Sequence, residues 1–130
     1  MDTWKETILG SSQDQFIIFT DLECRECRRG ATQLSKLANI TKDNPLIGRV
    51  DCMKNPIVCN IFKDRDSKNK MLPRMIFISQ GSLYQYTGRI DADEISKWIN
   101  ESQFKQNKKS FIHRNIDEFV QNAEQELRRE

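Results

Sequence analysis

The pattern of apolar positions in the first hundred residues predicts strands that alternate with helices. Residues 15–20 are rich in aromatic and β-branched side chains and are bounded by polar ones, which predicts a buried strand. Residues 24–40 carry apolar or small side chains at helical spacing, and Asn44-Pro45 ends that helix. The same reasoning predicts a short helix at 3–9, strands at 46–52, 74–79 and 82–87, a helix that begins at Pro56, and a helix at 91–100.

This order of elements predicts an α/β domain with a central mixed sheet flanked by helices. The first two strands are joined by a helix, so they should be parallel and connected by a right-handed crossover. The last two strands are joined by the turn residues Gln80-Gly81, so they should form an antiparallel hairpin at the sheet edge. We therefore expect a single domain over residues 1–101.

The part of the chain after residue 101 has a different pattern. Residues 102–111 are polar and are predicted to be a linker. Residues 112–130 are predicted to be an amphipathic C-terminal helix, because apolar residues recur there at helical spacing. The stripe leaves alternatives open: the helix folds back on the domain, stands as a partly ordered tail, or forms a short coiled-coil seam with a second copy. The stripe consists of Ile116, Val120, Ala123 and Leu127.

Composition and charge place the chain among ordinary globular proteins. Of its 130 residues, 37% are hydrophobic and 31% are charged. The formal net charge of +2, from 21 scattered basic and 19 acidic residues, gives no electrostatic reason to expect nucleic acid as a partner. The longest apolar stretch, residues 16–19, is too short to cross a membrane. The first residues lack the pattern of a secretory signal, so we expect either a cytosolic chain or a mature or excised segment.

A C-x-x-C motif, Cys24-Arg25-Glu26-Cys27, stands between the first predicted strand and its helix. A cysteine at a helix N-terminus is favoured as the reactive thiolate by the helix dipole and by backbone N–H groups without partners. The second cysteine lies one helical turn further on, within reach of a disulfide. The motif therefore predicts dithiol chemistry, in which Cys24 attacks a substrate disulfide and the more buried Cys27 resolves the mixed disulfide.

Other readings of the motif stay open at this point. The pair could be a structural disulfide or half of a metal site. A metal site needs two more ligands, which Cys52 and Cys59 could supply; the only histidine, His113, lies in the C-terminal part. The residues themselves predict no bound metal and no cofactor.

Several segments resemble, in order, the catalytic domains of the protein disulfide isomerase family within the thioredoxin superfamily. The likeness covers about residues 3–101 and implies a thioredoxin fold with oxidoreductase or isomerase activity on protein disulfides. Its partners would be protein or peptide clients, with glutathione or a second oxidoreductase. The segments are Phe16-Ile17-Ile18-Phe19 before the motif, Arg49-Val50-Asp51-Cys52, Leu72-Pro73-Arg74, Gly81, and Tyr86-Thr87-Gly88-Arg89.

The resemblance also implies roles for single residues. Pro73 would be cis and, with Leu72 and Arg74, would present backbone to a substrate strand. Arg89 would approach the buried cysteine and ease its deprotonation, because a nearby cation favours the thiolate.

A second disulfide, between Cys52 and Cys59, is implied by the resemblance as well. Such a disulfide indicates an oxidising compartment, here the lumen of the endoplasmic reticulum or the secretory pathway. The glycosylation triplets that begin at Asn39 and Asn100 agree with that location. Two buried free thiols would instead favour a cytoplasmic protein.

The sequence departs from that family's pattern at three places. Glu23 stands where an aromatic residue usually precedes the first cysteine, and its carboxylate disfavours the Cys24 thiolate. Ile18 stands where the family usually buries a carboxylate that accepts a proton from the second cysteine. Between the cysteines, Arg25 favours the thiolate and Glu26 opposes it. We therefore expect a slow or specialised oxidoreductase, with a redox-tethered client-binding module or a cytosolic thioredoxin-like reductant as alternatives.

Overall fold

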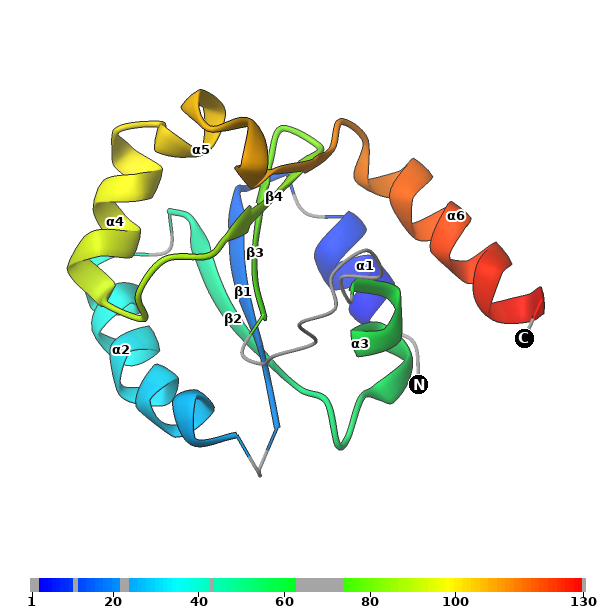
Figure 1. Cartoon of the computed structure of the whole chain (residues 1–130), viewed down its shortest axis with the longest axis horizontal. Coiled ribbons are helices and arrows are strands. Elements are labelled where there is room, and N and C mark those ends of the chain that lie inside the picture. The colour runs from blue at the N-terminus through cyan, green and yellow to red at the C-terminus, as the bar shows by residue number, and fades with distance from the viewer. Residues whose placement is uncertain (1–2, 11, 22–23, 43, 63–73, 130) are drawn as a thin grey trace.

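A computed structural model of the chain describes residues 3–10, 12–21, 24–42, 44–62 and 74–129. A five-stranded sheet lies between two layers of helices (Figure 1). The strands are β1 (Gln15–Thr20), β2 (Leu46–Asp51), β3 (Arg74–Ser79), β4 (Ser82–Tyr86) and β5 (Phe111–His113). The helices are α1 (Thr3–Leu9), α2 (Arg25–Thr41), α3 (Pro56–Phe62), α4 (Ala92–Asn100), α5 (Gln103–Gln106) and α6 (Ile116–Arg129), with a 3-10 turn, η1 (Lys108–Ser110). Within these described ranges, no helix is long and apolar enough to cross a membrane.

The strands lie in the order β2-β1-β3-β4-β5. β1 and β2 are parallel, while β1–β3, β3–β4 and β4–β5 are antiparallel. The parallel start and the antiparallel hairpin predicted from the sequence are both confirmed. All six residues of β1 are buried, which is why this strand has a continuous apolar run rather than an alternating pattern.

Each face of the sheet carries its own apolar core, since successive side chains of a strand point to opposite faces. On one face Phe16, Ile18 and Phe77 pack with residues of α2, α4 and α5. On the other face Ile17 and Phe19 pack with residues of α1, α3 and α6. Figure 1 shows these two sets of helices on opposite sides of the sheet.

The segment 102–111, predicted to be a polar linker, instead contains α5, η1 and the first residue of β5. Phe104 of α5 is only 5% exposed, and its ring centroid lies 4.8 Å from those of Phe77 and Tyr84. β5 pairs with β4 and adds a strand that the sequence did not predict. The reason is physical: one aromatic residue in a polar run has no periodic pattern, and its burial depends on rings from elsewhere in the chain.

The C-terminal helix begins at Ile116 rather than at residue 112, because residues 111–113 belong to β5. Its apolar stripe packs against the core face that α1 and α3 also cover. Lys5 Nζ of α1 lies 2.8 Å from Glu124 Oε2 of α6. Of the alternatives left open by the sequence, the structure therefore has the helix folded back on the domain.

Candidate functional site

The C-x-x-C motif lies where β1 ends and the chain turns into α2. Cys24 is the N-cap residue of α2, with an extended backbone (φ −90°, ψ 111°). Its Sγ accepts a hydrogen bond of 3.1 Å from the backbone N–H of Cys27. A disulfide joins Cys24 to Cys27, whose Cα atoms are 5.2 Å apart. In the reduced protein the same N–H group would stabilise a thiolate on Cys24, as expected for a cysteine at a helix N-terminus.

The two sulfur-bearing residues differ in burial. Cys27 is 5% exposed, whereas Cys24 is partly exposed. An incoming disulfide can therefore reach Cys24 more readily than Cys27. Chemically, this arrangement allows Cys24 to attack and Cys27 to resolve.

Ile18 occupies the core beneath α2, one strand position before Phe19. It is 1% exposed and belongs to the cluster between the sheet and α2 and α4. A Cβ atom added to Gly30 would stand 3.0 Å from Ile18 Cδ1, so glycine lets α2 approach β1 closely here. The position at which the resemblance in sequence implies a carboxylate is thus filled by an alkyl group that can accept no proton.

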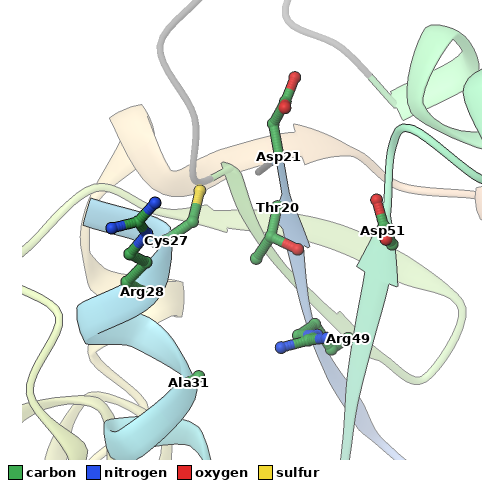
Figure 2. Close-up of a pocket in the computed structure, with 7 residues that line it drawn as sticks. All are labelled: Thr20, Asp21, Cys27, Arg28, Ala31, Arg49 and Asp51. Carbon is green, nitrogen blue, oxygen red and sulfur yellow. The ribbon is translucent and has the colours of Figure 1, made fainter. Parts of the chain in front are cut away.

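An open pocket of about 280 Å³ lies between α2 and the ends of β1 and β2 (Figure 2). It reaches the buried cysteine of the motif. This pocket was not predicted from the sequence, although polar residues at the carboxyl ends of two parallel strands could have indicated it. The pairing of β1 with β2 places Ile18 beside Arg49 and Thr20 beside Asp51. The residues that line the pocket are Thr20, Asp21, Cys27, Arg28, Ala31, Arg49 and Asp51.

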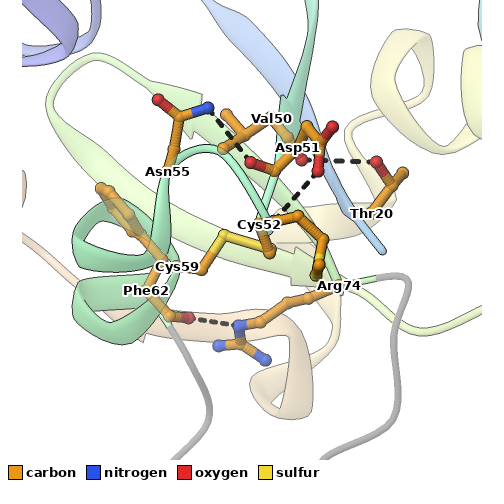
Figure 3. Close-up of a disulfide and its surroundings, with 9 residues drawn as sticks. Thr20, Val50, Asp51, Cys52, Asn55, Cys59, Phe62 and Arg74 are labelled. Carbon is orange, nitrogen blue, oxygen red and sulfur yellow. Dashed lines mark hydrogen bonds between the residues drawn. A yellow bond between two sulfur atoms is a disulfide. The ribbon is translucent and has the colours of Figure 1, made fainter. Parts of the chain in front are cut away.

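The second disulfide joins Cys52 and Cys59, whose Cα atoms are 5.7 Å apart (Figure 3). It links the end of β2 to α3. The backbone N–H of Cys52 donates to Thr20 O at 2.9 Å, and that of Asn55 donates to Asp51 O at 2.9 Å. The crosslink therefore holds the turn that follows Asp51, the last residue of β2, which lines the pocket.

Replacing both Cys52 and Cys59 with serine should lower the free energy of unfolding by about 2–3 kcal/mol, because the unfolded chain then regains the entropy of a small loop. Denaturant titration of this double variant beside the unchanged protein measures the loss. Exchange at Cys24–Cys27 should continue in the double variant. Unchanged stability would show that the crosslink does not constrain the unfolded chain as expected.

Tyr86 fixes the backbone near Arg89. Its hydroxyl donates a 2.6 Å hydrogen bond to Arg89 O, while the Arg89 side chain is exposed. Burial, with smaller contributions from the carboxylates of Glu94 and Asp91, raises the pKa of Tyr86 from 10.0 to about 12. The proposed approach of Arg89 to the buried cysteine stays a prediction.

The raised pKa of Tyr86 makes stability depend on pH. Between about pH 10 and pH 12 the unfolded state has lost the phenolic proton and the folded state still holds it, so the free energy of unfolding should fall by roughly 2 kcal/mol as pH rises. Denaturant titrations at several pH values check this. In the Tyr86→Phe variant most of this decrease in the free energy of unfolding should disappear. In Tyr84→Phe the decrease should remain. Equal pH dependence in the two variants would contradict the assignment.

The remaining predicted site residues are placed as follows. Arg74 begins β3, and its guanidinium donates to Phe62 O at 2.5 Å (Figure 3). The same guanidinium donates to Gln85 Oε1 at 3.1 Å. Arg25 is exposed in the first turn of α2. The glycosylation candidates Asn39 and Asn100 are exposed on α2 and α4.

The other predicted site positions lie outside the described residues. They are Glu23, Leu72, Pro73 and the side chain of Glu26. Among the residues that are described, no group of three or more His, Cys, Asp or Glu could hold a metal ion.

Solved structures with a similar fold include the Trx4 domain of ERdj5, with a TM-score of 0.63 and 21% identity over 79% of this chain and 90% of its own. The first thioredoxin domain of mouse protein disulfide-isomerase A4 gives a TM-score of 0.59 and 21% identity over 77% of this chain and 70% of its own. Zinc-bound human ERp44 gives 0.62 and 19% identity over 79% of this chain. At these identities the likeness shows the fold alone.

The chain spans only part of some of these proteins: 31% of the ERp44 chain and 41% of the J-Trx1 fragment of ERdj5. No curated protein compared with this chain matches it in sequence. The thioredoxin family, by contrast, matches residues 1–101, which is most of the chain. The mixed sheet, the flanking helices and the disulfide-bonded C-x-x-C motif at the start of α2 agree with that match. The chain belongs to the thioredoxin family.

Proposed function

We propose that this chain is a thiol–disulfide oxidoreductase or isomerase that acts on protein disulfides through Cys24 and Cys27. The observation that carries the proposal is the asymmetry of the pair. Cys24 caps α2 and is partly exposed, while Cys27 is buried and bonded to it. A reactive thiol that a client can reach, with a resolving thiol behind it, is what disulfide exchange requires.

The reaction proceeds in two exchanges. The Cys24 thiolate attacks one sulfur of a client disulfide, forming a mixed disulfide and releasing the other client sulfur as a thiolate. Cys27 then attacks Cys24 Sγ, so that the Cys24–Cys27 bond forms and the second client sulfur leaves. The client gains two electrons and the dithiol loses them. The reverse sequence donates a disulfide to a client.

The proposed partners are protein or peptide clients and, to reset the pair, glutathione or another oxidoreductase. An oxidising compartment such as the endoplasmic reticulum is supported by the second disulfide, Cys52–Cys59. It is also supported by the similarity in fold to a domain of a protein disulfide isomerase. Free thiols at Cys52 and Cys59 in the native protein would instead favour a cytoplasmic reductant.

The test is a redox titration. The protein is equilibrated in a series of glutathione buffers, its thiols are trapped by alkylation, and the modified cysteines are identified by mass. We expect Cys24–Cys27 to titrate reversibly near the poise of the endoplasmic reticulum while Cys52–Cys59 stays oxidised. A Cys24–Cys27 pair that stays fully oxidised or fully reduced throughout would overturn the proposal.

A second candidate function is a redox-tethered module that captures clients with little turnover. The observation that favours it is Ile18: in the part of the chain that the structure describes, no buried carboxylate lies beneath α2 beside Cys27. Such a module should hold mixed disulfides on Cys24 for a long time. Rapid multiple turnover with glutathione and a disulfide peptide would rule it out.

A further inference from the structure

Resolution of a mixed disulfide requires Cys27 to lose its proton. Burial disfavours the charged form of a thiol, because the thiolate loses its hydration. Cys27 is 5% exposed, and the neighbouring core position is taken by Ile18. Among the residues that the structure describes, a carboxylate that takes this proton must therefore lie outside the core beneath α2.

The pocket between α2 and β2 offers such an acceptor. Cys27 is one wall of it, and Asp51 at the end of β2 forms the wall across from α2 (Figure 2). Its volume of about 280 Å³ is enough for several water molecules, each of which takes about 30 Å³ in the liquid. A proton can therefore pass from Cys27 to a carboxylate through solvent.

We infer that Asp51 accepts the Cys27 proton through solvent in this pocket, in place of a carboxylate at the Ile18 position. The inference rests on the proposed function, since it concerns the second exchange. The Cys27 proton passes to the Asp51 carboxylate, Cys27 Sγ bonds to Cys24 Sγ, and the client sulfur leaves as a thiolate that takes a proton from water. The carboxylate then returns its proton to solvent.

The position of Asp51 is well defined. Its Oδ1 accepts a 3.0 Å hydrogen bond from Met53 N–H. The next residue along the chain after Asp51 is Cys52, which the disulfide joins to Cys59. The second carboxylate of the pocket, Asp21, belongs instead to the segment between β1 and the motif. Asp51 is therefore the carboxylate that the sheet and a crosslink together hold at the pocket.

The other charged groups around the pocket act on the same step. Arg28 of α2 and Arg49 of β2 line it and place positive charge near the developing Cys27 thiolate. Asp21 opposes them. Lys54 stands in the turn after Asp51, and its backbone N–H donates to Asp51 O. These groups adjust the rate, but among the described residues that line the pocket only Asp51 and Asp21 are carboxylates that can take the proton.

The test separates the two exchanges in time. Reduced protein is mixed with oxidised glutathione, and samples quenched with acid give the rate of mixed-disulfide formation and the rate of its resolution. With a general base, the resolution rate should change little between about pH 5.5 and pH 7.5. Without one, it should rise about tenfold per pH unit, because only thiolate formed in equilibrium with solvent reacts. If the resolution rate of the unchanged protein rises about tenfold per pH unit, the inference is overturned before any variant is made.

Asp51→Asn keeps an oxygen for Met53 N–H but cannot take a proton. We expect it to resolve the mixed disulfide about 10–100-fold more slowly at pH 6 and to acquire the steep pH dependence. Asp51→Glu should restore much of the flat profile. Asp93→Asn, at an exposed position on α4, is the matched control and should behave as the unchanged protein.

The outcomes are distinguishable. Loss of the flat profile in Asp21→Asn but not in Asp51→Asn would assign the proton to Asp21 and overturn the inference. Equal rates and pH profiles in Asp51→Asn and Asp93→Asn would overturn it as well. Failure of the unchanged protein to form any mixed disulfide at Cys24 would instead contradict the proposed function.

Discussion

Replacing Cys24 with serine should abolish disulfide exchange, lowering the rate with a model disulfide peptide by about a thousandfold or more. A serine hydroxyl is not ionised near neutral pH and cannot form a mixed disulfide. Cys27→Ser should leave the first attack intact and trap a mixed disulfide on Cys24. Peptide reduction followed by fluorescence, with mass analysis of the trapped species, measures both effects.

The matched control for these variants is the double replacement of Cys52 and Cys59 with serine, which removes the other disulfide. It should still form a mixed disulfide at Cys24, because the first attack uses neither Asp51 nor the second disulfide. Equal losses of activity in the Cys24→Ser and control variants would show that the activity depends on folding rather than on the Cys24 thiolate.

Replacing Val120 with aspartate should lower the free energy of unfolding by about 3–5 kcal/mol. Val120 is 1% exposed in the apolar core that α6 shares with α1 and α3. An aspartate there must either lose its hydration or detach α6 from the sheet. Denaturant unfolding followed by circular dichroism measures the change.

Gln121→Asp provides the matched control, because Gln121 is the next residue of α6 and is exposed. It should change the free energy of unfolding by less than about 0.5 kcal/mol. Equal stabilities for the two variants would mean that α6 does not dock on the domain in solution. The effect of Val120→Asp should also be independent of protein concentration, since the stripe packs within one chain.

The elements predicted well from the sequence are those whose signals are local. Residues 16–19 of β1 are an unbroken apolar run, and Pro56 stands at the first position of α3, where its missing N–H costs nothing. Asp91 accepts hydrogen bonds from Asp93 N and Glu94 N as the N-cap of α4. Each of these features involves residues within a few positions of one another.

The elements that were missed depend on partners far along the chain. Phe104 is the single buried residue of α5, and its neighbours are rings of α4, β3 and β4. β5 is three residues long and exists because β4 offers an edge. Neither feature leaves a periodic pattern, so the sequence predicted a linker in place of α5 and a helix in place of residues 112–113 of β5.

The candidate site was predicted in part for the same reason. The spacing of Cys24 and Cys27 is local, so their disulfide and the cap at α2 follow from the motif. The pocket depends on the register that sets Thr20 beside Asp51. The sequence shows where each strand ends but not which residues meet across the pair, so the pocket could be described only with the structure.

The separation of the core into two faces also has a consequence for synthesis on the ribosome. The face covered by α2, α4 and α5 draws its buried residues from Phe16 to Phe104, whereas the other face needs Ile8 from α1 and Ala123 from α6. A nascent chain therefore has all the residues of the first core before α6 leaves the exit tunnel. The second core closes last, because it needs contacts between residues far apart in the sequence. Until then its apolar sheet face is exposed and can bind chaperones.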